Sequence, residues 1–137
     1  MDRRKFLSTT ALGSAGMVLG ATPQEAPAIH TRKPADRLRI GVIGTGLRGQ
    51  SHIALALQRD DCDVTAICDI DERMLARTRK IIADAGRPAA REYTGSEEAW
   101  RELLAKEDLD AVLIATPWRW HSVMCNEAMK AGRYVGT

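Results

Sequence analysis

The sequence predicts an α/β protein of the Rossmann type, a doubly wound parallel sheet with helices on both faces. Three observations carry this prediction: an apolar strand over 38–43, a glycine-rich turn directly behind it, and an apolar run at helical spacing after the turn. Strand, glycine turn and helix in this order form the βαβ unit that binds dinucleotides. The chain of 137 residues is long enough for one domain with a core, and hardly for two.

The glycine turn spans residues 44–49 and has the pattern Gly-x-Gly-x-x-Gly. Gly44 suits the tight turn, Gly46 leaves no Cβ between the backbone and a pyrophosphate, and Gly49 lets the helix approach the strand closely. The phosphates would lie on free N–H groups at the positive end of a helix predicted over 47–57. The glycines alone are weak evidence, because any tight strand-to-helix turn favours glycine.

A second buried strand, predicted over 63–68, ends at Asp69. Dinucleotide-binding units carry an acidic residue about 20 positions beyond the glycines. The Asp69 carboxylate can accept both hydroxyls of the adenosine ribose and would repel a 2′-phosphate, so we predict NAD rather than NADP as the cofactor. The alternative is that Asp69 caps the next helix; Asp71 suits that role and leaves Asp69 free.

The following segments continue the alternation of helices and strands. An amphipathic helix after Asp71 ends at Gly86, and residues 89–93 form at best a short strand. Residues 94–97 can supply a capping box for a helix that ends near Lys106. That helix turns Trp100, Leu103 and Leu104 inward.

A strong buried strand over 110–115 leads into Thr116-Pro117-Trp118-Arg119-Trp120-His121, which we expect to be a loop. A loop after a parallel strand faces the same crevice as the glycine turn. Indole faces can stack on a nicotinamide, a ribose or a sugar ring. We therefore predict ligand contacts for this stretch; the alternative for His121 is a packing residue at the start of the next helix.

The last segments are a helix ending at Gly132 and the beginning of a strand over 133–137. One face of the helix carries His121, Met124, Cys125, Ala128 and Met129. We expect Met124 and Met129 to belong to the core.

The first 28 residues have the composition of an export signal. A basic start that contains Arg3 and Arg4 precedes a weakly apolar stretch over 6–20, and residues 26–28 offer a small-x-small cleavage site. The start resembles a twin-arginine signal, so we predict an exported, periplasmic protein without a stable membrane anchor. The alternative is a disordered basic tail. Residues 29–37 are predicted to be a leader into the first strand.

Composition excludes other classes of function. The formal net charge is +2 with both signs interleaved, and no basic, aromatic-rich face suggests nucleic-acid binding. The three cysteines, Cys62, Cys68 and Cys125, form no C-x-x-C pair and are best explained as small buried side chains. A disulfide between Cys62 and Cys68 is the alternative, although a strand between them would hold them apart. No metal site is predicted.

Taken together, several motifs resemble the N-terminal part of the Gfo/Idh/MocA oxidoreductase family. They are Gly44-x-Gly46-x-x-Gly49-x-x-His52, the strand ending at Asp69, Thr116-Pro117-x-x-x-His121, and residues 131–135. Within that family, residues 46–52 and 116–121 are most similar to the NAD-dependent glycoside hydrolases of family 109, the α-N-acetylgalactosaminidase type. The resemblance covers residues 38–137.

The resemblance implies contacts with NAD for particular residues. It places Leu47 and Arg48 at the pyrophosphate and Asp69 at the adenosine ribose. The residues that it places on the nicotinamide side are Trp118, Arg119, Trp120 and His121. It also implies a larger second α/β domain that holds most of the sugar site and the catalytic residues. We expect this chain to be the incomplete, cofactor-binding part of such a protein, and we assign no catalytic residue to it.

The implied reaction is glycoside hydrolysis in which the sugar is oxidised at C3, eliminates its aglycone from C1, adds water and is reduced again. A sugar or polyol dehydrogenase of the same wider family is the alternative, and a nucleotide-binding module without catalysis is a third. Apolar surface left open by the short sheet would favour instability or homo-oligomers.

Overall fold

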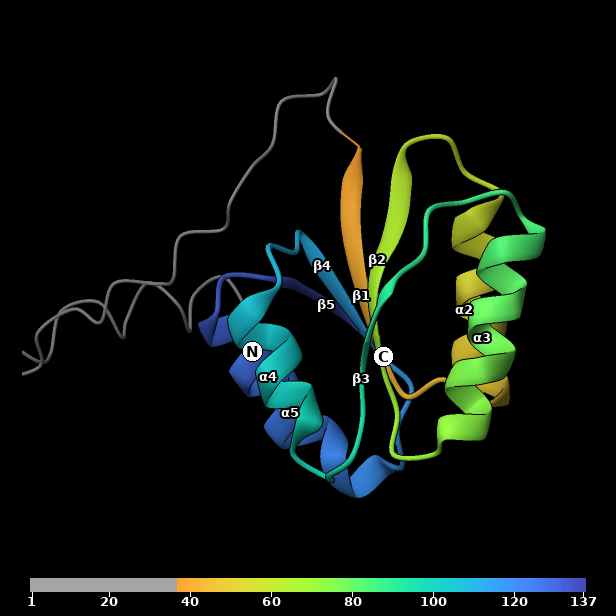
Figure 1. The fold of residues 1–137 in the computed structure, drawn as a ribbon. Helices are drawn as coiled ribbons and strands as arrows, with labels where there is room; N and C mark the ends of the chain where they lie inside the picture. The colour runs from red at the N-terminus through yellow and green to blue at the C-terminus, as the bar shows by residue number, and fades with distance from the viewer. Residues whose placement is uncertain (1–36) are drawn as a thin grey trace, which may run out of the picture.

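The computed structural model describes residues 37–137, which form a five-stranded parallel sheet between two layers of helices. The predicted export signal and residues 29–36 of the predicted leader lie outside the described residues. Helices α2 and α3 cover one face of the sheet, and helices α4 and α5 cover the other (Figure 1). The predicted Rossmann-type, doubly wound architecture is confirmed.

The strands are β1 (Leu38–Ile43), β2 (Cys62–Cys68), β3 (Arg91–Tyr93), β4 (Ala111–Ile114) and β5 (Tyr134–Gly136). The helices are α2 (Leu47–Leu57), α3 (Glu72–Asp84), α4 (Ala99–Lys106) and α5 (Trp118–Lys130). The strand order is β3-β2-β1-β4-β5, and every neighbouring pair is parallel. Chain order therefore runs outward in both directions from β1, and ligands bind such sheets beyond the carboxyl ends of the strands at this switch point.

Each face of the sheet has its own apolar core, because successive strand residues point to opposite faces. Val42 is fully buried with Ile53 and Ile82 beneath α2 and α3. Its neighbour Ile43 packs with Trp100 and Met124 beneath α4 and α5. Two cores on one sheet explain why β1 and β2 read as nearly continuous apolar runs.

Local signals set several boundaries as predicted. Strand β1 and helix α2 have the predicted bounds. The side chain of Asp71 accepts a hydrogen bond from the Arg73 N–H at 2.9 Å and so caps α3. Gly86 follows α3 with a φ of +67°, and Gly132 follows α5 with a φ of +75°. Both glycines end their helices in the left-handed conformation, as expected.

Two predictions about the helices, one on capping and one on packing, are wrong. The N-cap of α4 is Glu98, and it makes no side-chain capping bond, so residues 94–97 do not form a capping box. Met129 is 46% exposed, whereas Met124 and Ala128 are buried. Since five residues turn a helix by about 140° beyond a full turn, Met129 points away from the face that carries Met124.

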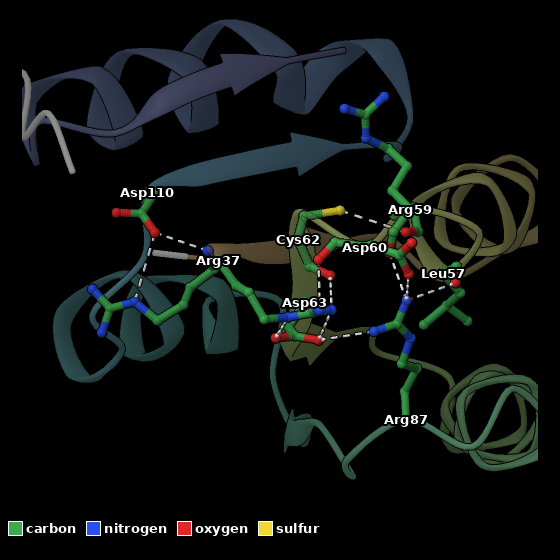
Figure 2. A network of polar contacts seen from close by, with 10 residues as sticks. Arg37, Leu57, Arg59, Asp60, Cys62, Asp63, Arg87 and Asp110 are labelled. Atoms are coloured by element: carbon green, nitrogen blue, oxygen red, sulfur yellow. Dashed lines mark hydrogen bonds and ion pairs between the residues drawn. The ribbon is translucent and has the colours of Figure 1, made fainter. Parts of the chain in front are cut away.

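Two arginines, Arg37 and Arg87, bind Asp63 near the amino end of β2 (Figure 2). The Arg37 guanidinium donates to both oxygens of Asp63, at 2.6 and 2.8 Å. The Arg87 guanidinium lies 3.7 Å from the same carboxylate and donates to the carbonyl oxygens of Leu57 and Arg59, at 3.2 and 2.5 Å. Arg37, the last residue of the predicted leader, is thus fastened to the sheet.

Candidate functional site

The glycine turn joins β1 to α2 and forms one wall of the crevice. Gly44 has a φ of +89°, and a Cβ there would lie 2.8 Å from the carbonyl carbon of Ala115. A Cβ at Gly49 would lie 2.0 Å from the carbonyl oxygen of Gly44, so the close approach of helix and strand requires glycine. A Cβ at Gly46 would meet no protein atom within 4 Å. Gly44 and Gly49 are thus needed by the fold, whereas Gly46 borders open space.

Helix α2 presents its N-terminus at this open space. Its N-cap, Gly46, provides no side-chain hydrogen bond, and its first turn contains no acidic residue. The first helical bond joins the Gln50 N–H to the Gly46 carbonyl at 2.9 Å, so the N–H groups of residues 47–49 have no partner within the helix. Leu47 is 81% exposed beside them. Such a helix end attracts a phosphate.

Asp69 follows β2 and faces the turn. Its Oδ2 accepts from the Thr45 N–H at 2.6 Å and from the Thr45 hydroxyl at 3.1 Å, and its Oδ1 accepts from the Asp71 N–H at 2.9 Å. A carboxylate offers about four lone-pair positions, so one remains on Oδ1. In this arrangement Oδ1 of Asp69 keeps an acceptor position toward the cleft, and its contact with the ribose hydroxyls stays a prediction.

No cation neutralises the Asp69 charge within the described part of the chain. No Lys, Arg or His nitrogen of residues 37–137 lies within 4.0 Å of its carboxylate oxygens. An unneutralised carboxylate held by neutral donors beside an open cleft suits a ligand that offers hydroxyls, and it disfavours one that offers phosphate at the same place.

The crevice consists of two hollows that share Ala115 and Thr116. One, of about 310 Å³, lies between the glycine turn, the end of β2 and α5, and its polar or aromatic walls include Asp69, Glu97, Arg119 and Trp120. The other, of about 590 Å³, is lined by Arg48, His52, Trp118, His121 and Thr137. The four residues predicted on the nicotinamide side are thus divided, two to each hollow.

Of the stretch 116–121 predicted as a loop after β4, Thr116 and Pro117 precede the helix, and residues 118–121 form the first turn of α5, which begins at Trp118. Pro117 takes the N-cap position with a φ of −57°, a position where a missing N–H costs little. Trp118 is 90% exposed, and its ring stacks on His121 with centroids 6.5 Å apart and planes 14° apart. The loop prediction is therefore wrong for residues 118–121, because the aromatic residues gave no helical signal of their own.

The first turn of α5 also fixes polar groups. His121 Nε2 lies 2.8 Å from the Thr116 carbonyl oxygen, and because that oxygen can only accept, Nε2 carries the proton. Arg119 lies 3.8 Å from Glu97, and its guanidinium carbon is 5.7 Å from the centroid of the Trp120 ring. This turn therefore offers the second hollow an exposed indole and an oriented imidazole.

Sequence analysis missed Thr45, Ile70 and Glu97 as parts of the site. Thr45 stands at the variable position between two glycines, and its partner Asp69 is 24 residues away. Ile70 is 67% exposed and lines the first hollow. For Thr45 the only signal in the sequence is its position next to Gly46, and for Ile70 its position next to Asp69. Neither position predicts a contact in the site.

The cysteines stay outside the chemistry of the site. All three thiols are free, so Cys62 and Cys68 form no disulfide, and burial raises the pKa of the Cys68 thiol to about 12. Among residues 37–137, no group of three His, Cys, Asp or Glu side chains is placed to hold a metal ion. In the same range, no helix has the length and apolar character needed to cross a membrane.

A glycine turn with open space at Gly46, a helix N-terminus without a side-chain cap and a carboxylate held by neutral donors together fit a dinucleotide. They define a dinucleotide-binding Rossmann domain. Residues 38–136 match the Gfo/Idh/MocA oxidoreductase family, described as having an NAD-binding Rossmann fold, and the chain belongs to that family. NAD is the cofactor of this domain.

Curated relatives extend the comparison. The chain is 34% identical over 148 residues to a glycosyl hydrolase family 109 protein of Shewanella pealeana and 40% identical over 148 residues to an α-N-acetylgalactosaminidase of Tannerella forsythia. Each match covers 98% of this chain and 32% of the relative. The chain therefore spans about a third of the length of these relatives.

Solved structures show the same fold. The scyllo-inositol dehydrogenase of Lactobacillus casei with bound NAD(H) and scyllo-inositol has a TM-score of 0.60 at 22% identity, over 73% of this chain and 27% of that one. The WlbA dehydrogenase of Bordetella pertussis, in complex with NADH and UDP-GlcNAcA, has a TM-score of 0.57 at 31% identity, over 72% and 28%.

Proposed function

We propose that this chain is the NAD-binding part of an exported glycosidase of the α-N-acetylgalactosaminidase type. One observation carries the proposal: 40% identity over 98% of the chain to the α-N-acetylgalactosaminidase of Tannerella forsythia. The exposed indole of Trp118 beside a hollow of about 590 Å³ supports it, because aromatic faces bind sugar rings as well as nicotinamide.

The chain's own residues would hold and orient the cofactor. The N–H groups at the start of α2, next to Leu47 and Arg48, would bind the pyrophosphate, and Asp69 would accept a ribose hydroxyl through Oδ1. Trp118 and His121 would border the nicotinamide. NAD would take a hydride from the sugar and return it within one turnover, so the net reaction would be hydrolysis.

A sugar or polyol dehydrogenase is the second candidate. It is favoured by the 31% identity and TM-score of 0.57 to the WlbA dehydrogenase, whose structure contains NADH and a nucleotide sugar. The two candidates use one cofactor site and differ in what is released. A glycosidase frees the aglycone without net change in NAD, whereas a dehydrogenase accumulates NADH and an oxidised sugar.

The decisive experiment supplies p-nitrophenyl α-N-acetylgalactosaminide to the full-length natural protein. We expect release of p-nitrophenol with no net absorbance change from NADH. NADH formation without p-nitrophenol would overturn the glycosidase in favour of the dehydrogenase. Binding of NAD with neither product would leave a nucleotide-binding module and overturn both enzymatic proposals.

Export is tested separately. In a bacterial host we expect the full-length protein to reach the periplasm and the double variant Arg3→Lys, Arg4→Lys to remain in the cytoplasm. Equal distribution of the two proteins would contradict the twin-arginine prediction and leave the glycosidase proposal untouched.

A further inference from the structure

We infer that Thr45 is a positioning residue that sets the preference for NAD over NADP by holding the carboxylate of Asp69 in place. The inference rests on the proposed contact between Asp69 and the adenosine ribose and goes beyond it, because it assigns discrimination to a residue that touches Asp69 rather than the ribose. Four contacts in the glycine turn and at the end of β2 carry it.

The N–H, the hydroxyl and the carbonyl oxygen of Thr45 all form hydrogen bonds within the protein. Its side chain is fully buried, and both its N–H and its hydroxyl donate to Oδ2 of Asp69, at 2.6 and 3.1 Å. Its carbonyl oxygen accepts from the Gln50 amide at 2.8 Å. The residue is thus tied to α2 on one side and to the end of β2 on the other, and none of its polar groups faces the cleft unpaired.

The result is a carboxylate that cannot easily rotate. Two donors of Thr45 hold Oδ2, and the Asp71 N–H holds Oδ1 at 2.9 Å. These donors are neutral, so they orient the carboxylate without cancelling its charge. The remaining acceptor position on Oδ1 and the full negative charge both stay at the wall of the first hollow, which Asp69 lines.

Discrimination against a 2′-phosphate depends on this immobility. A mobile carboxylate could swing away from an incoming phosphate and relieve the repulsion between like charges. A carboxylate held by three hydrogen bonds would have to break some of them to move, and bonds to a charged group are the stronger kind. Thr45 therefore turns the negative charge of Asp69 into a fixed barrier to NADP.

The test compares variants that differ by a single hydroxyl. Thr45→Val replaces the hydroxyl by a methyl group of similar size, whereas Thr45→Ser keeps the hydroxyl and loses only the methyl. Dissociation constants for NAD and NADP are measured by calorimetry on the full-length protein freed of bound dinucleotide. We expect Thr45→Val to lower the ratio of the NADP to the NAD constant about fivefold, and Thr45→Ser to keep the wild-type ratio.

A merely structural role would weaken both dinucleotides equally and leave that ratio unchanged in Thr45→Val, which would overturn the inference. Should Thr45→Val not fold, Thr45→Ala and Thr45→Ser form a second pair that differs by the same hydroxyl, with the same expected and contrary results. Asp69→Asn separates the two levels. If Asp69→Asn lowers the ratio and the hydroxyl variants do not, only the role of Thr45 fails; if Asp69→Asn also leaves it unchanged, the ribose contact fails too.

Discussion

The two ends of strand β2 carry aspartates that differ in what surrounds them. Asp63, near the amino end, accepts two hydrogen bonds from the guanidinium of Arg37 and lies 3.7 Å from that of Arg87. Asp69, just past the carboxyl end, is bound only by N–H and hydroxyl groups among the described residues. The first carboxylate is neutralised by the protein, and the second keeps its charge. A charge that the fold leaves uncompensated beside an open cleft is available to select a ligand.

The glycines repeat this contrast within a single turn. Gly49 is required because any Cβ would collide with the Gly44 carbonyl oxygen at 2.0 Å, whereas Gly46 faces open space. One glycine lets the elements pack, and the other lets a ligand approach. Each of the following variants tests whether a residue belongs to the fold or to the ligand.

The largest effect is expected for Gly49→Ala. The added methyl group meets backbone atoms that cannot move aside, so we expect a loss of about 3 kcal/mol in the free energy of unfolding, which lowers Tm by several degrees in a protein of this length. Thermal unfolding of the full-length protein followed by circular dichroism measures it. A Tm within about two degrees of wild type would show that α2 can retreat from β1 at little cost.

The matched control is Gly46→Ala, in the same turn. Its backbone has a φ of −65° and a ψ of −168°, which alanine adopts without strain, and its Cβ meets no protein atom. We expect an unchanged Tm without ligand and an NAD dissociation constant raised at least about tenfold, since the methyl would occupy the phosphate's space. Wild-type NAD affinity in this variant would place the pyrophosphate elsewhere.

A smaller effect is expected for Asp63→Asn at the opposite end of the sheet. The amide cannot neutralise Arg37, and it leaves Arg87 without its nearest carboxylate on β2. We expect Tm to fall by less than in Gly49→Ala and the ratio of the NADP to the NAD dissociation constant to stay at the wild-type value. A changed ratio would mean that the two ends of β2 are coupled, so that Asp63 would influence ligand selection as well as stability.

We also expect the contribution of Asp63 to the free energy of unfolding to depend on pH. The hydrogen bond from Arg37 holds the pKa of Asp63 below its usual value. Because the folded-state pKa is depressed, the stabilisation is fully present above the unfolded value of about 3.9 and is lost as the pH falls through the lower folded value. Urea unfolding between pH 6 and pH 2.5, compared in wild type and Asp63→Asn, should show a shallower acid loss in the variant. Parallel curves would contradict this assignment.

Strong local patterns made much of the fold predictable from the sequence. The apolar β-branched run of β1, the three glycines and the amphipathic spacing of α2 each report their own structure within a few residues, and the predicted bounds of β1 and α2 hold. The start of α5 was missed because tryptophan is a weak helix former, and the stacking of Trp118 on His121 exists only once the helical turn has formed. The 90% exposure of Trp118 follows from the fold alone.

Contacts between distant segments were not predictable in the same way. Arg37 and Asp63 are 26 residues apart, and Thr45 and Asp69 are 24 apart. Their pairing depends on the register of β1 against β2, with Leu38 opposite Cys62 and Ile43 opposite Cys68. The sequence indicated that Asp69 reaches the crevice, but only the register shows that Thr45 holds it there.

The smallest effect on stability, and a clear one on binding, is expected for Trp118→Ala. An indole that is 90% exposed contributes little to the fold, so we expect a change in stability within about 0.5 kcal/mol. If the indole borders bound NAD, its removal should weaken NAD binding by about threefold to tenfold in calorimetry. The control is Leu55→Ala on α2, since Leu55 is 61% exposed and belongs to neither hollow of the crevice. Equal NAD affinity in both variants would assign Trp118 to contacts other than the cofactor, with a sugar ring the first alternative to test.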